Sequence, residues 1–311
     1  MSDPIEPREE PLFERMALIG IGLIGSSLSL AARRAGLVGE IVGTARSEAT
    51  CQTALRLGLV DRVAATAGEA AQGADLVVLA GPVGIYGQLT EEMSSHLKPG
   101  AIVTDVGSVK AHVVEAAGPH IPEGVHFIPG HPIAGTEQSG PEAGFAELFD
   151  NRWTILTPVP GTSPEALAKL SAFWTGLGAR IETMTPEHHD LVLAITSHVP
   201  HLIAYNIVGT AEDLADVTQS EVTKYSAGGF RDFTRIAASD PTMWRDIFLT
   251  NKTAVLEMLG RFVEDLSVLQ RAIRDEDGER LFELFERTRE IRKRIVEQGQ
   301  ETTAPDFGRR S

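Results

Sequence analysis

The stretch GHPIAGTEQSG at 130–140 places a titratable ring in a segment with few apolar side chains. His131 is suited to accept a proton near neutral pH, because an unperturbed imidazole titrates at about 6.5. The three glycines and one proline are typical of a loop and not of a helix or strand. Because the preceding run VHFIPG (125–130) is typical of a strand, we expect His131 at the carboxyl edge of a sheet, where open α/β sheets bind ligands.

A hydroxyl group follows another predicted strand. Ser108 comes just after the run AIVTDV (101–106) and should reach the same edge of the sheet. Its hydroxyl can cap a helix that begins at Val109 and can also contact a ligand, because a hydroxyl both donates and accepts. Lys110 is interpreted as structural or solvated.

Two arginines offer positive charge within a chain of formal net charge −15. Arg231 and Arg235 are four residues apart, so a helix would place them on one face. The pair Gly228–Gly229 lets the chain turn sharply before them. Guanidinium groups bind carboxylates in bidentate fashion, which predicts an anionic ligand. A solvated surface position is the alternative, above all for Arg231.

The motif SHVPH (197–201) brings Ser197, His198 and His201 close together around a proline. A zinc site needs a third and a fourth ligand, and no Cys, His or carboxylate cluster supplies them, so we predict no metal. His198 is interpreted as a buried histidine satisfied by a neighbour, and the proline as a kink in a helix. His188 and His189 are expected to be solvated.

A phosphate-binding signature lies near the N-terminus. The stretch GIGLIGSS has G-x-G-x-x-G spacing between a strand-like run and a helical one. In that context the first glycine makes a tight turn, the second admits a pyrophosphate and the third allows close helix–strand packing. A glycine-rich turn without a ligand is the alternative. The residues predicted to bind the cofactor are Gly20, Gly22, Leu23, Ile24, Gly25, Arg46, Ser47 and Pro82.

The end of the second predicted strand bears on the choice between NAD and NADP. A carboxylate there would pair with a free ribose 2′-hydroxyl. The strand EIVGTA (40–45) is instead followed by Arg46 and Ser47, and Glu48 is the nearest acid. An arginine can pair with a 2′-phosphate, which favours NADP slightly, whereas Arg46 stacked on adenine or facing solvent would leave NAD in use.

The elements that must position these residues change character near residue 184. Before it, short Val/Ile-rich runs alternate with helical segments, which predicts a doubly wound, mostly parallel α/β Rossmann domain at 15–184. After it, apolar residues recur with helical period, which predicts an all-α domain at 185–298. We expect a disordered lead at 1–14 and a disordered tail at 299–311. The apolar helical faces favour a homodimer through the second domain.

Composition narrows the class of protein. The net charge of −15 disfavours nucleic acid and anionic membranes as partners. No apolar run approaches the ~20 residues needed to cross a bilayer. Cys51 is the only cysteine, which excludes an internal disulfide, and the N-terminus lacks the features of a signal peptide. A cytoplasmic location is expected.

Taken together, GIGLIGSSL, DVGSVK, GHPIAGTEQSG, SHVPH and GGFRDFTRIAASDPTMWRDI resemble the prephenate/arogenate dehydrogenase family of tyrosine biosynthesis over about residues 16–298. No mutase-like or regulatory ACT-like segment is evident, so the free-standing form is expected. The resemblance implies a Rossmann domain, a helical dimerisation domain and an active site in the cleft between them. The implied reaction moves a hydride from ring carbon 4 to a nicotinamide while the ring carboxylate leaves as CO2.

The resemblance also implies roles for single residues. His131 would bond the substrate's 4-hydroxyl, and Ser108 would bridge His131, that hydroxyl and the nicotinamide. Arg235 would bind a substrate carboxylate. The implied substrate-binding residues are Arg235, Arg231, His201, Ser197, Glu137 and Gly228. Glu137 would gate the cleft or only stabilise its own loop.

Substrate and class have open alternatives. His201 favours prephenate over arogenate, and dual specificity stays open. A β-hydroxyacid-type dehydrogenase usually needs a catalytic lysine in its helical domain, but Lys224 and Lys252 lack a supporting motif. A non-enzymatic NADP sensor need not keep His131 and Ser108 together with an arginine such as Arg235.

Overall fold

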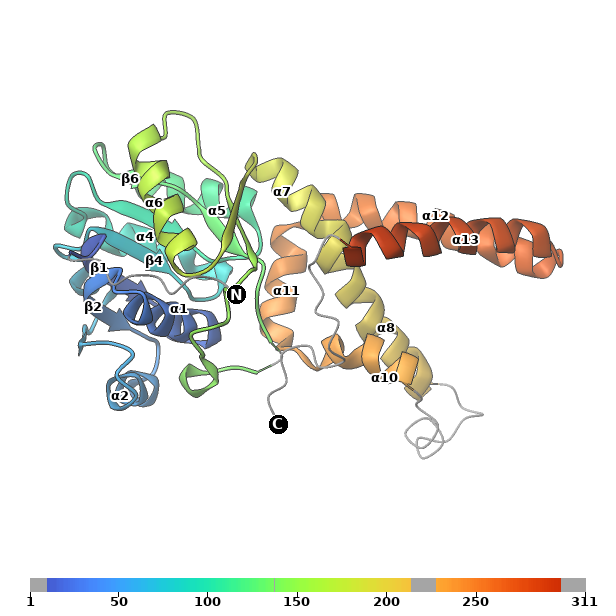
Figure 1. The fold of residues 1–311 in the computed structure, drawn as a ribbon, viewed down its shortest axis with the longest axis horizontal. Helices are drawn as coiled ribbons and strands as arrows, with labels where there is room; N and C mark the ends of the chain where they lie inside the picture. Colours follow the sequence, from blue (N-terminus) through green and yellow to red (C-terminus); the bar gives the residue numbers. More distant parts are fainter. Residues whose placement is uncertain (1–9, 137, 214–227, 298–311) are drawn as a thin grey trace. The chain divides into compact units, whose positions relative to one another are not determined.

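The computed structural model describes residues 10–136, 138–213 and 228–297, so Glu137 and both chain ends lie outside the described residues. The chain divides into a unit of residues 1–255 and a unit of residues 256–311. Figure 1 shows that the first begins with strands and helices in alternation and ends in helices alone. Its regular elements up to residue 120 are β1 (Phe13–Ile19), α1 (Leu23–Arg34), β2 (Val38–Thr44), α2 (Glu48–Arg56), β3 (Arg62–Val63), α3 (Ala67–Ala71), β4 (Leu76–Leu79), η1 (Val83–Ile85), α4 (Tyr86–Met93), η2 (Ser94–His96), β5 (Ile102–Asp105), α5 (Lys110–Ala117) and η3 (Gly118–His120).

The main sheet has six strands in the order β3-β2-β1-β4-β5-β6, where β6 is His126–Phe127, and every pairing is parallel. The chain order reverses between β1 and β4, which creates a crevice at the carboxyl ends of these two strands. The Rossmann prediction is confirmed. β1 begins at Phe13, inside the segment predicted to be a disordered lead.

Side chains of β1 alternate between two cores because successive residues of a strand point to opposite faces. Met16 and Leu18 belong to the core shared with helices α1 and α6 (Pro164–Gly176), whereas Ala17 and Ile19 belong to the core shared with α3, α4 and α5. Helices therefore cover both faces of the sheet. This burial on two sides explains why its strands are continuous apolar runs.

A second, three-stranded sheet carries the residues that follow β6. It has the order β7 (Gly130–Pro132), β8 (Trp153–Leu156) and β9 (Arg180–Thr183), with β7–β8 antiparallel and β8–β9 parallel. A 3-10 turn, η4 (Pro141–Ala143), lies between β7 and β8 and contacts α1 and α2. The predicted strands at 153–158 and 179–184 therefore exist, but they leave the main sheet.

The rest of the first unit is helical, and several helices begin with a capping residue followed by proline. Thr185, Ser163 and Asp240 each accept a hydrogen bond from a first-turn backbone N–H, and proline suits the next position because its missing N–H would be unpaired there. These later helices are α7 (Pro186–Leu193), η5 (Ala194–His198), α8 (Val199–Asp213), α10 (Gly228–Thr234), η6 (Arg235–Ala238) and α11 (Pro241–Thr250).

α7, η5 and α8 form one run of 28 residues, Pro186–Asp213. η5 is a π-helical turn, in which the N–H of Val199 bonds the carbonyl of Ala194. The predicted kink near Pro200 thus takes the form of a π turn just before the proline, which has no N–H to donate. By length and composition alone this run could cross a membrane, contrary to the expectation that no apolar run is long enough, and 28% of its most apolar window is buried.

α12 (Lys252–Arg274) and α13 (Gly278–Glu297) supply the described part of the second unit. They lie side by side as a helical hairpin turned at Asp275–Asp277 (Figure 1). Large apolar side chains along the hairpin stay 50–65% exposed: Leu256, Val263, Leu266, Ile273, Phe282 and Phe285.

Candidate active site

His131 lies in a strand and not in a loop, which corrects the prediction from its glycine-rich context. It pairs with Ile155 in the β7–β8 ladder and is only 9% exposed. Gly130 lets this happen, since a Cβ there would stand 3.1 Å from the Asp105 carbonyl oxygen and 3.2 Å from the Leu156 side chain. Local glycine content predicts loops, but here the glycine serves a close approach of strands.

The His131 ring contacts a second buried histidine. Its Nδ1 atom lies 2.9 Å from Nε2 of His189, and Nδ1 of His189 lies 2.8 Å from Oδ1 of Asp190. A carboxylate only accepts, so His189 donates from Nδ1 and accepts at Nε2. His131 must then donate from Nδ1, which leaves its Nε2 lone pair for a ligand. The prediction that His189 is solvated is wrong, because this residue is 0% exposed.

Asp190 joins α7 to the start of α5. Its two carboxylate oxygens accept from the backbone N–H groups of Lys110, at 2.7 Å, and Ala111, at 2.9 Å. These are first-turn N–H groups that have no partner inside the helix. Asp190 therefore caps α5 from outside, and the three donors keep the carboxylate oriented toward His189.

Ser108 is not the cap of α5. The helix begins at Lys110 with Val109 at the capping position and no side-chain cap from that position. The Ser108 hydroxyl is partly exposed and forms no hydrogen bond with any of the described residues. The capping role predicted for this hydroxyl is therefore wrong, and its contact with a ligand stays a prediction.

Burial controls protonation at this cluster. Burial lowers the pKa of His131 well below its ordinary 6.5, and the positive charges of neighbouring groups, Lys110 among them, lower it further. Burial also lowers the pKa of His189 to about 2. Both rings are therefore neutral at pH 7. A neutral His131 accepts a hydrogen bond without first losing a proton.

Asp105 and Lys110 form a buried ion pair behind this cluster. Both side chains are fully buried, and Lys110 Nζ donates to Asp105 Oδ2 and, at 2.7 Å, to the carbonyl of Gly130. Asp105 also accepts from the N–H groups of Gly107, at 2.7 Å, and Gly130, at 3.1 Å. The prediction that Lys110 has a structural role is confirmed, and the alternative that its side chain is solvated is wrong.

A second cluster forms where α8, η6 and α11 meet. His201 stacks on Trp244 with ring centroids 3.7 Å apart, and its Nδ1 donates to the Ser197 carbonyl at 2.8 Å. Burial lowers the pKa of His201, and the charge of Arg235 lowers it further. Arg235, His201 and Ser197 thus occupy one region, and their role in substrate binding stays a prediction. Here Ser197 contributes its backbone carbonyl.

His198 is a buried, neutral histidine, as predicted. Burial lowers its pKa to about 4, and the Asn251 amide lies 3.1 Å from its Nδ1. An amide N–H can only donate to that ring atom, so His198 carries its proton on Nε2. This Nε2 and the Trp244 Nε1 are buried without a hydrogen-bond partner in the structure. The same amide also donates to the Asp190 carbonyl, at 2.9 Å, and so ties α11 to α7.

The glycine loop has the geometry of a phosphate site. Gly20 has φ of 104°, and a Cβ there would stand 2.7 Å from the backbone of Ala80 and Gly81. Gly25 packs on the Gly20 carbonyl, whereas nothing lies within 4 Å of a Cβ built on Gly22. α1 begins at Leu23 with no side-chain cap, so the N–H groups of Leu23 and Ile24 and the helix dipole are available to an anion. These residues fit a dinucleotide pyrophosphate.

The other predicted cofactor residues lie at the same edge of the sheet. Arg46 is exposed after β2, and Ser47 caps α2 by accepting from Thr50 N–H at 3.1 Å. Pro82 immediately precedes η1 and comes three residues after the end of β4 at Leu79. The residue near the end of β2 is Arg46 and not a carboxylate. The nearest acid, Glu48, is the first residue of α2.

The remaining predicted residues lie in α10, which contacts α8 and η6, or outside the described residues. Arg231 is exposed in α10, while Arg235 begins η6, so the two arginines do not share one continuous α-helix. Gly228 starts α10, and Glu137 lies outside the described residues. Within the described residues no group of three or more His, Cys, Asp or Glu could hold a metal ion.

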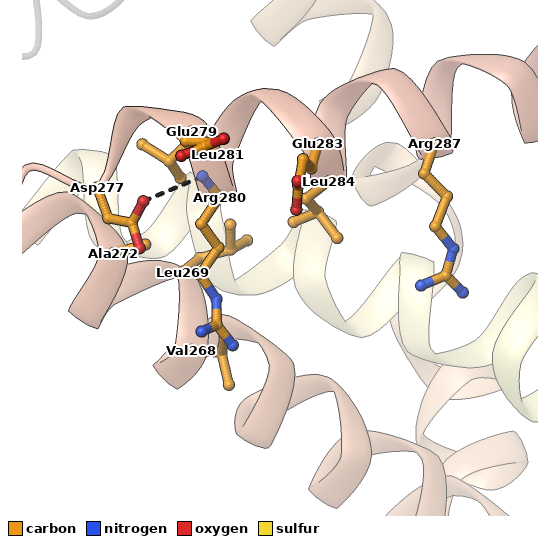
Figure 2. A pocket seen from close by; sticks show the side chains of 10 residues that line it. All are labelled: Val268, Leu269, Ala272, Asp277, Glu279, Arg280, Leu281, Glu283, Leu284 and Arg287. Atoms are coloured by element: carbon orange, nitrogen blue, oxygen red, sulfur yellow. Dashed lines mark hydrogen bonds between the residues drawn. The ribbon is translucent and has the colours of Figure 1, made fainter.

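A separate cavity of about 550 Å³ lies between α12 and α13 (Figure 2). Its walls mix apolar and charged side chains, and Asp277 accepts from the Arg280 N–H at 3.1 Å. The lining residues are Val268, Leu269, Ala272, Asp277, Glu279, Arg280, Leu281, Glu283, Leu284 and Arg287. None of them is among the predicted site residues, so the cavity is not the candidate active site.

Sequence reasoning missed the residues that orient His131. Asp190 and His189 sit in TPEHHD, where the cap signal Thr-Pro-Glu suggested only an exposed first turn. Asn251 lies outside the recognised motifs, and Trp244 lies within the stretch GGFRDFTRIAASDPTMWRDI, where no role was predicted for it. The helical period offered one signal. His189 and Leu193 are four residues apart, so they lie on the same, buried face of α7.

Two family models together cover most of the chain. One described as prephenate dehydrogenase, nucleotide-binding domain, matches residues 28–183, and one described as prephenate dehydrogenase, dimerization domain, matches residues 185–287. The chain is 41% identical over 281 residues to a cyclohexadienyl dehydrogenase of Zymomonas mobilis, covering 90% of this chain and 96% of the relative. It is 35% identical to a prephenate dehydrogenase of Bacillus subtilis, covering 90% of this chain and 75% of that one.

Solved structures agree with these matches. The crystal structure of prephenate dehydrogenase from A. aeolicus, in complex with hydroxyphenyl propionate and NAD+, has a TM-score of 0.84 at 35% identity. The alignment covers 91% of this chain and 98% of that one. The crystal structure of Synechocystis arogenate dehydrogenase has a TM-score of 0.77 at 31% identity, covering 90% and 99%.

Proposed function

Since this chain belongs to the prephenate dehydrogenase family, we propose that it oxidatively decarboxylates prephenate to 4-hydroxyphenylpyruvate with His131 at the reacting hydroxyl. The family makes the chain an oxidoreductase of tyrosine biosynthesis that uses a nicotinamide cofactor. The assignment of His131 as the proton acceptor rests on the hydrogen-bonded series Asp190–His189–His131, because this series leaves the His131 Nε2 as a hydrogen-bond acceptor.

His131 is proposed to accept the hydrogen bond of the substrate's 4-hydroxyl. As a hydride leaves carbon 4, positive charge develops on that carbon and its oxygen, and a neutral imidazole stabilises it by taking up the hydroxyl proton. Ser108, whose hydroxyl forms no hydrogen bond with any described residue, is proposed to contact the same substrate oxygen. When bound, the nicotinamide ring accepts the hydride. The electrons of the breaking bond to CO2 complete the aromatic ring, and His131 returns its proton to the ring oxygen, which gives the phenol of the product.

The second cluster is proposed to bind the substrate's side chain. Arg235 supplies the positive charge for a carboxylate, beside the His201 ring whose pKa its charge lowers. Arg231 and Gly228 are assigned to the same end of the substrate, and Glu137 to its rim. A guanidinium group binds a carboxylate through two parallel N–H bonds, which fixes orientation as well as charge.

Dual use of prephenate and arogenate is the second candidate, and the hydrogen bond of His201 favours it, in contrast to the preference for prephenate expected from the sequence. Its Nδ1 donates to the Ser197 carbonyl, so the neutral ring offers a lone pair at Nε2. A lone pair accepts from the ammonium group of arogenate, whereas the keto group of prephenate needs a donor. The name of the relative at 41% identity, cyclohexadienyl dehydrogenase, agrees with broad specificity.

For the cofactor we propose that NADP is accepted as well as NAD. Arg46 is exposed at the end of β2, where a carboxylate would repel a 2′-phosphate and an arginine would pair with it. The solved relative that resembles this chain contains NAD+, which supports use of the unphosphorylated form.

We also propose that two copies pair through the helical region, in the cytoplasm. The matched model of residues 185–287 is described as a dimerization domain. In the first unit Ile207 and Val208 on α8 are 40% and 39% exposed, and in the second unit Phe282 on α13 is 65% exposed. Exposed apolar side chains of this kind are stabilised when a second copy excludes water from them. Sedimentation of the full chain tests this.

The test of the activity is a four-way assay of the purified protein. Prephenate and arogenate are each combined with NAD and with NADP, and nicotinamide reduction is followed by absorbance. We expect turnover with prephenate, and turnover with arogenate as well if His201 acts as described. No reduction in any combination, from folded protein that binds the cofactor, would contradict the proposed function.

A further inference from the structure

The buried pair of Asp105 and Lys110 is not explained by the reaction described above. Both side chains are 0% exposed, and both carry a formal charge. Removing an ion from water costs several kcal/mol even in a relaxed protein, and apolar residues of the same volume often give equal or greater stability. Stability alone therefore gives little reason for an ion pair at this place.

The contacts of the pair show what it holds together. Asp105 ends β5 and accepts from the N–H of Gly107, just before Ser108, and from the N–H of Gly130, just before His131. Lys110 donates to Asp105 and to the carbonyl of Gly130. Both backbone groups of Gly130 are thus bonded by the pair.

The two glycines allow this approach. A Cβ on Gly107 would stand 2.9 Å from the Asp105 carboxylate and 2.5 Å from the Val83 side chain. On Gly130 it would crowd the Asp105 carbonyl and Thr104. Backbone without side chains on both sides lets a single carboxylate reach the N–H groups of two separate segments.

We propose that Asp105 and Lys110 are positioning residues that join the Ser108 loop to the His131 strand and place a fixed positive charge beside the His131 ring. This inference rests on the proposed function for its catalytic meaning, and on geometry for the contacts. Neither residue needs to touch the substrate.

The fixed charge has a consequence for His131. The His131 ring contacts His189 of α7, and Lys110 of α5 bonds the carbonyl of the preceding Gly130. The charges that act on the ring are those of His189, Lys110 and His198, with Asp190 bonded to His189 and Asp105 bonded to Lys110. Burial lowers the pKa of His131 most, and positive charge on these neighbours lowers it further. His189 and His198 are neutral at pH 7, because their pKa values are about 2 and about 4. Burial lowers the pKa of Lys110 as well, whereas its ion pair with Asp105 opposes that shift and favours the charged ammonium group.

The test is Lys110→Met in the full chain, which removes the charge and keeps the length of the side chain. The matched control is Lys98→Met, because Lys98 makes the same kind of contacts at the opposite end of the sheet, with Asp75 at 2.5 Å and the Gly73 carbonyl at 3.1 Å. The first readout is NMR titration of the His131 ring, assigned by comparison with His131→Asn. The second is the pH dependence of kcat/KM.

We expect Lys110→Met to raise the pH at which His131 titrates by about one unit, as for loss of a nearby charge, and to raise the acid limb of kcat/KM equally. Lys98→Met should move neither. If Lys110→Met fails to fold, the double variant Asp105→Asn, Lys110→Met removes both charges at nearly constant volume, and the rise should keep its sign. A folded variant in which His131 titrates as in the unmodified protein would overturn the inference. Because the NMR readout needs no turnover, it stays decisive even if the four-way assay fails.

Discussion

The Nδ1 of His131 and the Nε2 of His189 lie 2.9 Å apart, although the two residues are 58 positions apart in the chain. One comes from a short strand beside the sheet and the other from the first helix after it. The contact is therefore made only when the helical region packs on the Rossmann domain, as α5 and α7 do. Folding of the two regions together sets the tautomer of the proposed base.

Replacing His131 by Asn tests the proposed base directly. The amide keeps polarity but cannot take up a proton, so turnover should fall by about 10²- to 10⁴-fold, the range expected for loss of a general base. Cofactor affinity, measured by fluorescence titration, should stay unchanged because the glycine loop is intact. Near-normal turnover in this variant would remove His131 from the mechanism.

Replacing His189 by Leu tests the relay behind His131. Without the Nε2 acceptor, His131 is free to place its proton on Nε2 and present the wrong tautomer to the hydroxyl. Loss of an orienting partner of this kind can cost up to about 10⁴-fold in kcat, and we expect at least about a tenfold loss.

The control for that variant is the neighbouring residue. His188→Leu changes an exposed histidine in the same helical turn and should leave kcat unchanged. Equal losses in the two variants would show that the helix start, and not the relay, is being disturbed. Steady-state kinetics at a single pH is enough to separate them.

Arg235→Gln tests the second cluster. Glutamine keeps hydrogen-bonding capacity but loses the charge and the bidentate fork, so the KM for prephenate should rise far more than the KM for the cofactor, by at least about tenfold. Arg245→Gln is the control, since Arg245 is exposed and pairs with Asp246. Equal changes in both KM values for Arg235→Gln would mean that this arginine supports the fold instead.

Stability should fall with acid because several histidines are buried in the neutral form. The folded pKa of His198 is about 4 and that of His189 about 2, both below the ordinary value of about 6.5 in the unfolded chain. Between these pH values the unfolded chain binds more protons than the folded chain. The free energy of unfolding is therefore at its full value above pH 6.5 and decreases as the pH falls below 6.5. His198 alone should account for roughly 3 kcal/mol by pH 4.

Urea unfolding at pH 7.5, 6, 5 and 4.5 measures that decrease. His198→Gln should flatten it, because glutamine does not titrate, whereas His188→Gln should leave it as in the unmodified protein. A free energy of unfolding that does not change between pH 7.5 and 4.5 would contradict neutral burial of these rings.

The parts of the fold that follow from local pattern were predictable. The glycine spacing and the apolar runs predicted the Rossmann sheet, and the glycine conformations at Gly20 and Gly25 agree with the roles assigned to them. His131 was assigned to a loop because glycine content describes the chain locally, whereas its strand exists only through pairing with β8, more than 20 residues later. Long-range pairing overrides local propensity in this way.

The site itself was predictable only in its motif residues. Ser108, His131 and Arg235 stand in recognisable stretches, but the residues that orient them act through contacts across the fold. Asp190 caps a helix about 80 residues earlier in the chain, and Asn251 bonds His198 across 53 residues. A histidine in a first helical turn has no local feature that separates an exposed position from a buried relay, so His189 could be identified only from the structure.

Arg46 should decide how well NADP is used. Its guanidinium is exposed at the end of β2, where the ribose of a bound dinucleotide is expected, and Ser47 beside it already caps α2. Arg46→Asp replaces a group that pairs with a 2′-phosphate by one that repels it and instead accepts from a 2′-hydroxyl. We expect kcat/KM for NADP to fall by at least about tenfold, while that for NAD is kept or rises. Kinetics with both cofactors checks this, and Arg56→Asp, at an exposed arginine that ends the same helix, controls for the added negative charge. An unchanged ratio of the two cofactors would show that Arg46 faces solvent in the complex and that the 2′ position is read by another residue.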